Sequence, residues 1–377
     1  MGALARIGIA AAAACALVLI GPARAAASTE TEPIARLTLE GGYDSNPLYD
    51  GRSDRMERVS PELGLRVRDP LWDFDGLYLG DYLVYDRAAP QGIWNHRGLL
   101  ELKATPTRRL ELGGVLRGGY AYDPVGLAQM GIFRSGEQAA WTINGRGRAE
   151  YRVAERIDGA VTFTESTVVF QDRTGGAMHA PGAEALYRLT RRLSVGAAYA
   201  LGFFQGFDPK GNAIAFSHGL RGRARYRITR HVLANVYAGP AFWTGPDGHA
   251  LVPELGGELE LSNREWDLRT SAVHGLGIGS TARPGLVDSI EVGFVRRLGR
   301  TRTFDLRGDG GIWRSGQAPT GANATLGYAA SGELGWRVAQ SLRLALHVSH
   351  YDRLDNQSPA LERTTVGLRL GWSWEPR

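Results

Sequence analysis

The side chains in this sequence that are best suited to catalysis are a histidine and a serine near its C-terminus. His347 and Ser349 are two residues apart, so they share one face of a strand, and Glu362 begins the next segment. A carboxylate that orients an imidazole beside a hydroxyl is the arrangement that activates a serine nucleophile. The sequence contains no metal-ligand, phosphate-loop or nucleotide motif, so we expect no metal and no cofactor.

Arginines at every second position form the other candidate group. Such spacing places them on one face of a strand, as it does the acids Glu254, Glu258 and Glu260. Guanidinium groups bind carboxylate or phosphate bidentately, so an arginine-lined interior attracts anionic or hydroxyl-rich solutes. The alternative is a structural role, in which arginines and carboxylates on the same face of a sheet form ion pairs that link its strands. The arginines predicted to line a pore are Arg146, Arg148, Arg152, Arg221, Arg223, Arg225, Arg227, Arg307 and Arg369.

The alternation of residues predicts that strands carry these side chains. Between Leu193 and Phe203 every second residue is apolar, and the residues between them are serine, glycine or alanine. Eight short turns, most with arginine, divide such segments. Midway between the turns, an aromatic residue followed by aspartate, as in Tyr122-Asp123, opens a loop rich in proline, glycine or asparagine. One further strand at each end gives about 18 strands, with 16 as the alternative.

A transmembrane antiparallel up-and-down β-barrel accommodates this all-β pattern. The apolar faces would form a continuous outer band that lipid covers, and closure pairs every strand edge. A soluble all-β repeat protein is the rival fold, but nothing would cover its band. Short turns are expected on the periplasmic side and longer loops outside the cell. A barrel of this size can leave an open channel, and no segment is large enough to plug it, since no loop exceeds about a dozen residues; whether loops fold inward is left open.

The N-terminus predicts secretion. An apolar stretch from Ile7 to Ile20 follows Arg6 and precedes an Ala-rich exit, so residues 1–27 are interpreted as a cleaved signal peptide. Residues 28–34 would be a short periplasmic segment and residues 35–377 the barrel in the cell outer membrane. Cys15, the single cysteine, falls in the signal peptide, which excludes disulfides. A formal net charge of +5 is too even for a nucleic-acid partner.

Several motifs resemble those of the β-barrel porin type 2 family. They are the segment 39–47 (LEGGYDSNP), the repeated aromatic-Asp loops and the segment 349–353 (SHYDR). Barrels of this kind also resemble the outer-membrane barrels of myxobacterial polysaccharide-export systems. The resemblance implies about 18 strands, an exported polysaccharide as cargo and a periplasmic polysaccharide-export protein as partner. The alternating last strand is similar to the signal read by the barrel-assembly machinery.

Three functions follow as hypotheses. The first is an outer-membrane channel that completes export of an exopolysaccharide. The second is a general diffusion porin for small solutes. The third is a lipid hydrolase, because His347, Ser349 and Glu362 loosely resemble the residues of outer-membrane lipid A deacylases. We predict that the protein is not an enzyme, since the first two of these residues would face the lumen rather than the lipid. Outer-membrane lipid and lipopolysaccharide are expected around the barrel.

Overall fold

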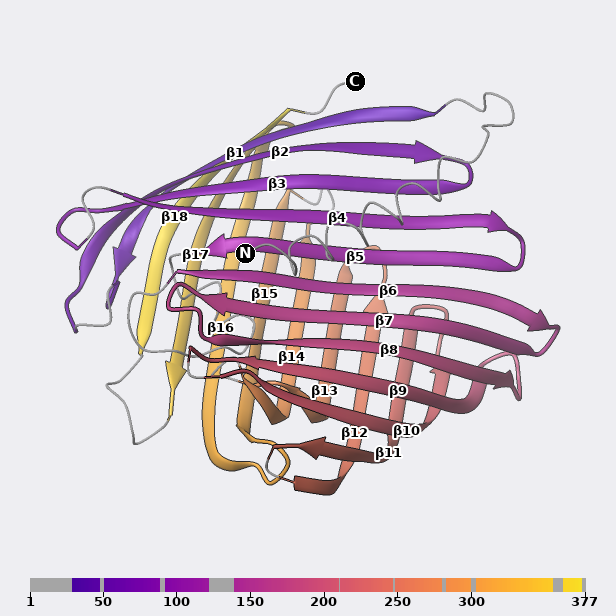
Figure 1. Cartoon of the computed structure of the whole chain (residues 1–377). Helices are drawn as coiled ribbons and strands as arrows, with labels where there is room; N and C mark the ends of the chain where they lie inside the picture. Colours follow the sequence, from indigo (N-terminus) through magenta and orange to yellow (C-terminus); the bar gives the residue numbers. More distant parts are fainter. Residues whose placement is uncertain are drawn as a thin grey trace.

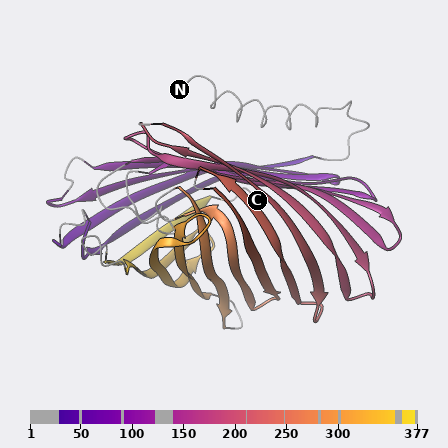
Figure 2. The same cartoon turned by 60° about the horizontal axis from the view of Figure 1, so that its bottom comes forward.

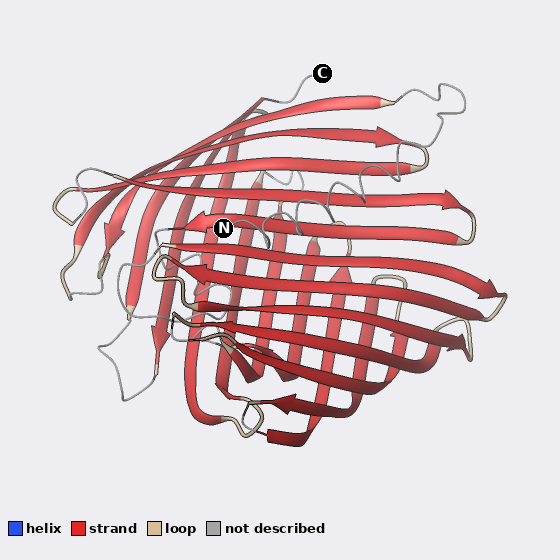
Figure 3. Cartoon of the chain, viewed as in Figure 1, coloured by secondary structure: helices blue, strands red, loops and turns tan. Residues whose placement is uncertain are grey.

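The protein folds as one sheet of antiparallel strands. The computed structural model describes residues 29–47, 51–88, 92–121, 139–209, 211–246, 248–279, 283–299, 303–354 and 362–374. Most of these residues lie in strands, and the described part contains no helix (Figure 3). No helix long and apolar enough to cross a membrane is therefore found there. The predicted signal peptide, residues 1–27, lies outside the described residues.

Eighteen strands, from 12 to 18 residues long, make up the sheet. Their bounds are β1 Glu30–Asp44, β2 Asp54–Asp69, β3 Trp72–Tyr85, β4 Ile93–Thr107, β5 Leu110–Ala121, β6 Ala140–Ala154, β7 Ile157–Phe170, β8 Gly175–Arg188, β9 Leu193–Phe207, β10 Ala213–Arg227, β11 Val232–Gly245, β12 Gly248–Ser262, β13 Trp266–Ile278, β14 Pro284–Leu298, β15 Phe304–Gln317, β16 Ala322–Ala339, β17 Leu342–Arg353 and β18 Arg363–Trp374.

The sheet is closed. Each strand pairs antiparallel with its neighbours in sequence, and β1 also pairs with β18, from Ala35 opposite Trp374 to Asp44 opposite Thr365. In Figure 1 strands β1–β9 form a front wall, and β12–β18 pass behind it at a large angle. Figure 2 shows the same two walls from below. Closure gives every strand two neighbours, as a membrane-spanning sheet requires. The prediction of an 18-stranded antiparallel up-and-down β-barrel is confirmed.

At one end of the barrel all connections are short, as the sequence predicts, whereas only some of those at the other end are longer. The strand-to-strand connections after β2, β4, β6, β8, β10, β12, β14 and β16 are short, and β1 begins and β18 ends on the same side. We call this side the turn side and the opposite one the loop side. Tyr43 and Phe207 lie at the loop-side ends of their strands. Aromatic residues at strand ends are typical of the boundary between lipid and water.

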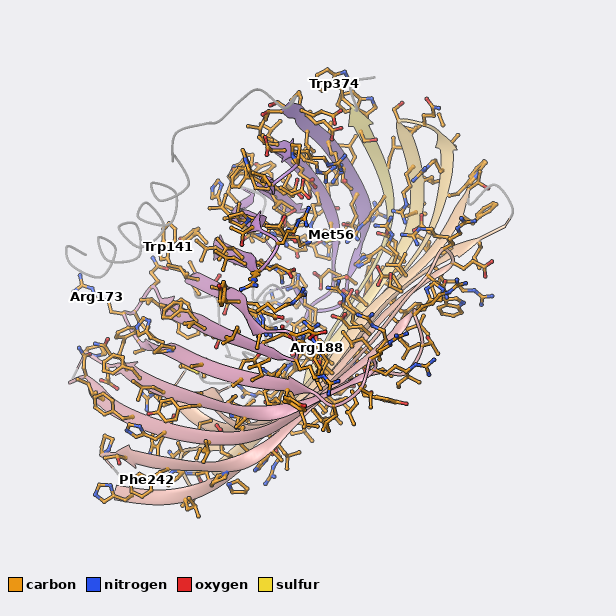
Figure 4. All side chains as sticks on the ribbon, turned by 90° about the vertical axis from the view of Figure 1, so that its right-hand side faces the viewer. Met56, Trp141, Arg173, Arg188, Phe242 and Trp374 are labelled. Carbon is orange, nitrogen blue, oxygen red and sulfur yellow. The ribbon has the colours of Figure 1, made fainter. Side chains whose placement is uncertain are left out.

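The outer surface of the wall is apolar. Leu220, Leu251 and Leu368 are 60%, 71% and 59% exposed, and their strand neighbours on the other face point into the barrel. Trp141 and Phe242 point away from the walls in Figure 4. Such a band is stable only against lipid, because exposed apolar area of this extent is unfavourable in water. Exterior and interior therefore follow directly from the two-residue period.

Two sequence expectations need correction. β1 begins at Glu30, so the predicted periplasmic segment 28–34 lies largely within the first strand, where it pairs with β2 as far as Arg68. The connection between β5 and β6 spans residues 122–139, which is longer than the dozen residues expected for the longest loop. Most of that connection lies outside the described residues.

The sequence left open whether the lumen is closed from within, and the structure shows that the β13–β14 hairpin folds inward at the loop side. β12 and β13 pair only from Ser262 opposite Asp267 to Leu255 opposite His274, whereas β13 and β14 stay paired to the tip. Beyond His274 the hairpin has left β12. In Figure 1 the lower ends of β13 and β14 lie behind the left-hand ends of β8–β10.

Apolar contacts hold the folded hairpin across the mouth. Its Leu276 and Leu286 share their strand face with His274, which belongs to the outer side of the wall. They nevertheless pack against Phe204, on the inner face of β9, in a cluster that also contains Ala215, Trp243, Val252 and Ala318. Ile278 at the tip packs against Phe170 of β7. The hairpin thus joins the two walls through side chains that would otherwise face lipid.

Candidate functional site

The inner surface of β6, β8 and β10 carries a network of arginines around one carboxylate. Glu184 on β8 is 7% exposed and accepts hydrogen bonds from both Arg148 on β6 and Arg223 on β10. Arg148 also donates to Glu150 on its own strand at 2.7 Å. Arg148 thus bridges two carboxylates and Glu184 bridges two guanidinium groups, so the four charges of this network balance. The partners lie on alternate strands, so their side chains must reach across the strand between them.

Small residues on the intervening strands let these long side chains meet. Glu184 is opposite Ala198 on β9, and Ala198 is opposite Arg221 on β10. Arg221 in turn donates to Glu254 on β12 at 2.7 Å, although β11 lies between them. Gly239 of β11 stands opposite Glu254, and a Cβ there would lie 1.9 Å from the Leu220 carbonyl oxygen. The alternation of charged and small residues therefore continues around the barrel as well as along it.

Not every arginine in this wall is neutralised. Arg146 has no ion pair within the described residues, and Arg225 donates only to the amide oxygen of Asn235, at 3.3 Å. Tyr237 lies within electrostatic range of Arg146, and the Arg221 guanidinium carbon lies 5.1 Å from the centre of its ring. Arg227, at the turn-side end of β10, is exposed. These side chains give β6–β10 an excess of positive charge facing the lumen.

The other arginines predicted to line the pore belong to wall ion pairs. Arg152 lies 3.7 Å from Asp158 and is half exposed. Arg307 donates to Asp305 at 2.9 Å and is also half exposed. Arg369 donates to Glu40 at 3.0 Å and to Glu333 at 2.9 Å. Arg152 and Arg369 fit the structural interpretation, because their partners lie on other strands and cross-link the wall, whereas Arg307 pairs within its own strand.

The wall opposite the arginines is richer in acids. A cavity of about 330 Å³ on the inner side of β12–β17 is lined by Glu258, Glu291, Asp309, one arginine (Arg269) and the aromatic rings of Trp313 and Tyr351, among others. Contacts of β8 with β13 and β14, and of β9 with β14, show that this wall faces β6–β10 across the lumen. A solute between the walls would therefore meet positive charge on one side and carboxylates on the other.

The candidate nucleophile and base do not form a catalytic pair. His347 and Ser349 face the lumen, as expected from their spacing. The Ser349 hydroxyl, however, is hydrogen-bonded to the Thr365 hydroxyl at 2.5 Å. The carboxylate beside His347 is that of Glu40 on β1, 3.4 Å from Nδ1, and not that of Glu362. The described contacts thus place the imidazole and the hydroxyl with separate partners, within the ion-pair network of the wall.

Sequence reasoning missed the acids that organise the lumen. Glu184 and Glu40 each bind two arginines from other strands of the wall. They stand singly among small or apolar residues, so no column marks them. The sequence feature that could have identified them is their position on the inward face of a strand whose other inward residues are mostly small. A single charge in such a position requires partners from other strands.

Comparisons with known proteins concern the barrel alone. The structure is similar to Pseudomonas aeruginosa OpdK solved with vanillate (TM-score 0.45, 11% identity, 91% of this chain and 99% of that one). It is also similar to P. aeruginosa OccK2 (OpdF) in complex with glucuronate (TM-score 0.43, 10% identity, 90% and 98%). A third similar structure is Acinetobacter baumannii OccAB3 (TM-score 0.41, 10% identity, 91% and 99%). Likeness at this level says nothing about solutes.

No protein-family model and no curated protein matches the chain. The β-barrel porin type 2 family and the myxobacterial export systems thus remain resemblances of motif. What is established is the architecture: a closed antiparallel barrel of 18 strands with an apolar outer surface, a charged interior and a loop-side mouth narrowed by its own wall.

Proposed function

We propose that this protein is an outer-membrane channel for small hydrophilic solutes, with a preference for anions. The inward-folded β13–β14 hairpin is the observation that carries the proposal. It joins both walls at the loop side through the Phe204 cluster and through an ion pair of 3.0 Å between Arg283 at its tip and Asp208 after β9. A hydrated polymer needs a wide and continuous path. Small solutes need only the space beside the hairpin.

The arginine network supports the preference for anions. Arg146 and Arg225 have no carboxylate partner within the described residues. A fixed excess of positive charge raises the local concentration of anions and lowers that of cations. Because the facing wall carries Glu258, Glu291 and Asp309, a zwitterion would align between the walls.

Reconstitution of the full-length mature protein tests the proposal. In planar bilayers under a salt gradient, the reversal potential should have the sign of anion preference. In liposome-swelling assays, monocarboxylates and monosaccharides should enter several times faster than oligosaccharides of about six sugars. Cation preference, or equal rates for monosaccharides and oligosaccharides, would contradict the proposal.

The polysaccharide-export hypothesis requires a wider mouth than the structure has. It requires the hairpin to swing back onto β12 and expose Leu276 and Leu286 to lipid, as their register on the sheet allows. A clean gene deletion separates the two hypotheses. Loss of secreted polymer with unchanged dye uptake would favour export, whereas normal polymer with reduced dye uptake would favour the small-solute channel.

A further inference from the structure

Histidines on the lipid-facing surface are unusual, and here they gather at one side of the barrel. Six of the eight histidines face outward on the loop-side half of their strands: His96, His179, His218, His249, His274 and His350. The turn-side half has no outward histidine among the described strands. A side chain that merely fills a lipid-facing position would be expected on both halves.

Two of these histidines form the same arrangement with a tyrosine. Tyr78 on β3 is hydrogen-bonded to Nδ1 of His96 on β4 at 2.7 Å, and Tyr199 on β9 to Nδ1 of His218 on β10, also at 2.7 Å. In each pair the histidine is paired, on the neighbouring strand, with the residue two positions after the tyrosine. The ring centres are 6.1 and 6.2 Å apart. All four side chains are exposed.

The hydrogen bond to tyrosine occupies Nδ1 of each imidazole and leaves Nε2 facing the lipid. The tyrosine hydroxyl can donate to Nδ1 or accept from Nδ1–H, so both tautomers are compatible with this contact. When the hydroxyl donates, the imidazole proton resides on Nε2, which has no protein partner in the described part of either His96 or His218. In this tautomer both pairs present an N–H donor to the membrane, where an unmet donor is unfavourable.

Aromatic pairs place these donors near the membrane interface. Tyr82 and Trp94 lie immediately to the loop side of His96, with ring centres 4.6 Å apart. Phe203 and Phe216 lie in the same position relative to His218, with ring centres 5.3 Å apart. Aromatic belts mark the boundary between acyl chains and headgroups. At this depth the lipid supplies acceptor oxygens that can receive Nε2–H.

We propose that the Tyr78–His96 and Tyr199–His218 pairs are binding sites for lipopolysaccharide of the outer leaflet. Each site donates Nε2–H to an acceptor oxygen at the sugar–acyl boundary, either a phosphate or an ester or amide carbonyl. The proposal rests on the outer-membrane location and on the assignment of the longer loops to the cell exterior. It is independent of what passes through the lumen.

The third tyrosine–histidine pair is a natural control. Tyr328 binds Nε2 of His350 at 3.0 Å, while Nδ1 of the same ring is bound to the Thr364 hydroxyl at 2.8 Å. Both nitrogens of His350 are thus occupied. This pair has the same residue types on the same outer surface, yet offers no free donor to lipid.

The test measures binding of lipid to the full-length barrel in detergent by native mass spectrometry. The probes are bisphosphorylated lipid A, dephosphorylated lipid A and phosphatidylglycerol. The double variant His96→Phe/His218→Phe should bind lipid A about tenfold more weakly, while His350→Phe stays within twofold of the wild type. Loss with only the phosphorylated lipid A assigns the acceptor to phosphate. Loss with both lipid A forms assigns it to a carbonyl.

Two further variants separate loss of the donor from damage to the barrel. His96→Gln/His218→Gln keeps an N–H donor and should retain most of the affinity, and Tyr78→Phe/Tyr199→Phe, which frees the tautomer, should lose part of it. Unchanged lipid A binding in the phenylalanine double variant would overturn the proposal. An equal loss in His350→Phe, or an equal loss of phosphatidylglycerol binding, would overturn it as well. Channel conductance, measured in parallel, tests the proposed function separately.

Discussion

Arg363 and Asp44 form an ion pair that connects the last strand of the barrel to the first. Arg363 Nη2 lies 2.5 Å from Asp44, and the two residues are 1% and 0% exposed. Tyr85 on β3 donates to Asp44 at 2.9 Å and accepts from Arg363 at 2.6 Å. The closing seam is thus fixed at the loop side by a buried, hydrogen-bonded group that spans three strands.

Breaking this pair is expected to destabilise the barrel strongly. Asp44→Asn leaves Arg363 buried without its counter-charge, which typically costs about 3–5 kcal/mol. Glu62→Gln is the matched control, because Glu62 pairs at 2.7 Å with Arg36, which is 43% exposed, and such pairs contribute less than about 1 kcal/mol. Urea unfolding in lipid vesicles measures both. Equal effects of the two variants would show that the seam does not depend on this pair.

Gly239 should tolerate no side chain. Gly239→Ala would place a Cβ 1.9 Å from the Leu220 carbonyl oxygen, so β10 and β11 would have to separate where Arg221 reaches Glu254. We expect a large loss of folded, heat-modifiable protein on electrophoresis. Gly293→Ala is the control, since a Cβ there meets nothing within 4 Å. Normal assembly of the Gly239 variant would show that this close approach is not required.

The charge of the arginine wall should set ion selectivity. Glu184→Gln leaves Arg148 and Arg223 without their shared carboxylate, so anion preference in planar bilayers should rise. Arg146→Gln removes a guanidinium that has no ion pair in the described structure, so anion preference should fall. Opposite shifts of the reversal potential are the expected result. Shifts in the same direction would indicate that these residues act by changing the shape of the pore.

The position of the β13–β14 hairpin can be tested by cross-linking. The only cysteine is Cys15, within the predicted signal peptide, so an introduced pair reacts without competition in the mature chain. Asp208→Cys/Arg283→Cys should be joined by a short thiol cross-linker, since these side chains meet at 3.0 Å. Asp208→Cys/Arg314→Cys should not, because Arg314 pairs with Asp288 on the outer face. Equal yields for both pairs would place the hairpin elsewhere.

Weakening the mouth should widen it. Arg283→Ala together with Leu286→Ser removes the ion pair to Asp208 and part of the apolar contact that holds the hairpin against β9. We expect higher single-channel conductance and faster entry of oligosaccharides in swelling assays. The Arg314→Ala variant, on the outer face, should leave both unchanged. A conductance equal to wild type in the double variant would mean that the hairpin does not limit flow.

The sequence by itself determined the class of fold, the strand number and the two faces of each strand. These follow from a period of two residues and from turn chemistry, which are local, so Leu220 faces lipid and Arg221 faces the lumen wherever the strand lies. The arginine columns were visible for the same reason. Only the closed sheet decided which charges meet, because Glu184 reaches Arg148 and Arg223 across intervening strands.

The inward fold of the β13–β14 hairpin could not be predicted from the sequence, for a different physical reason. Leu276, Ile278 and Leu286 have the alternation of lipid-facing residues, and in a straight hairpin they would face lipid. Burial against the inner face of β7 and β9 satisfies the same apolar side chains as well as lipid does. A local pattern cannot distinguish two apolar environments. The tertiary structure alone decided between them.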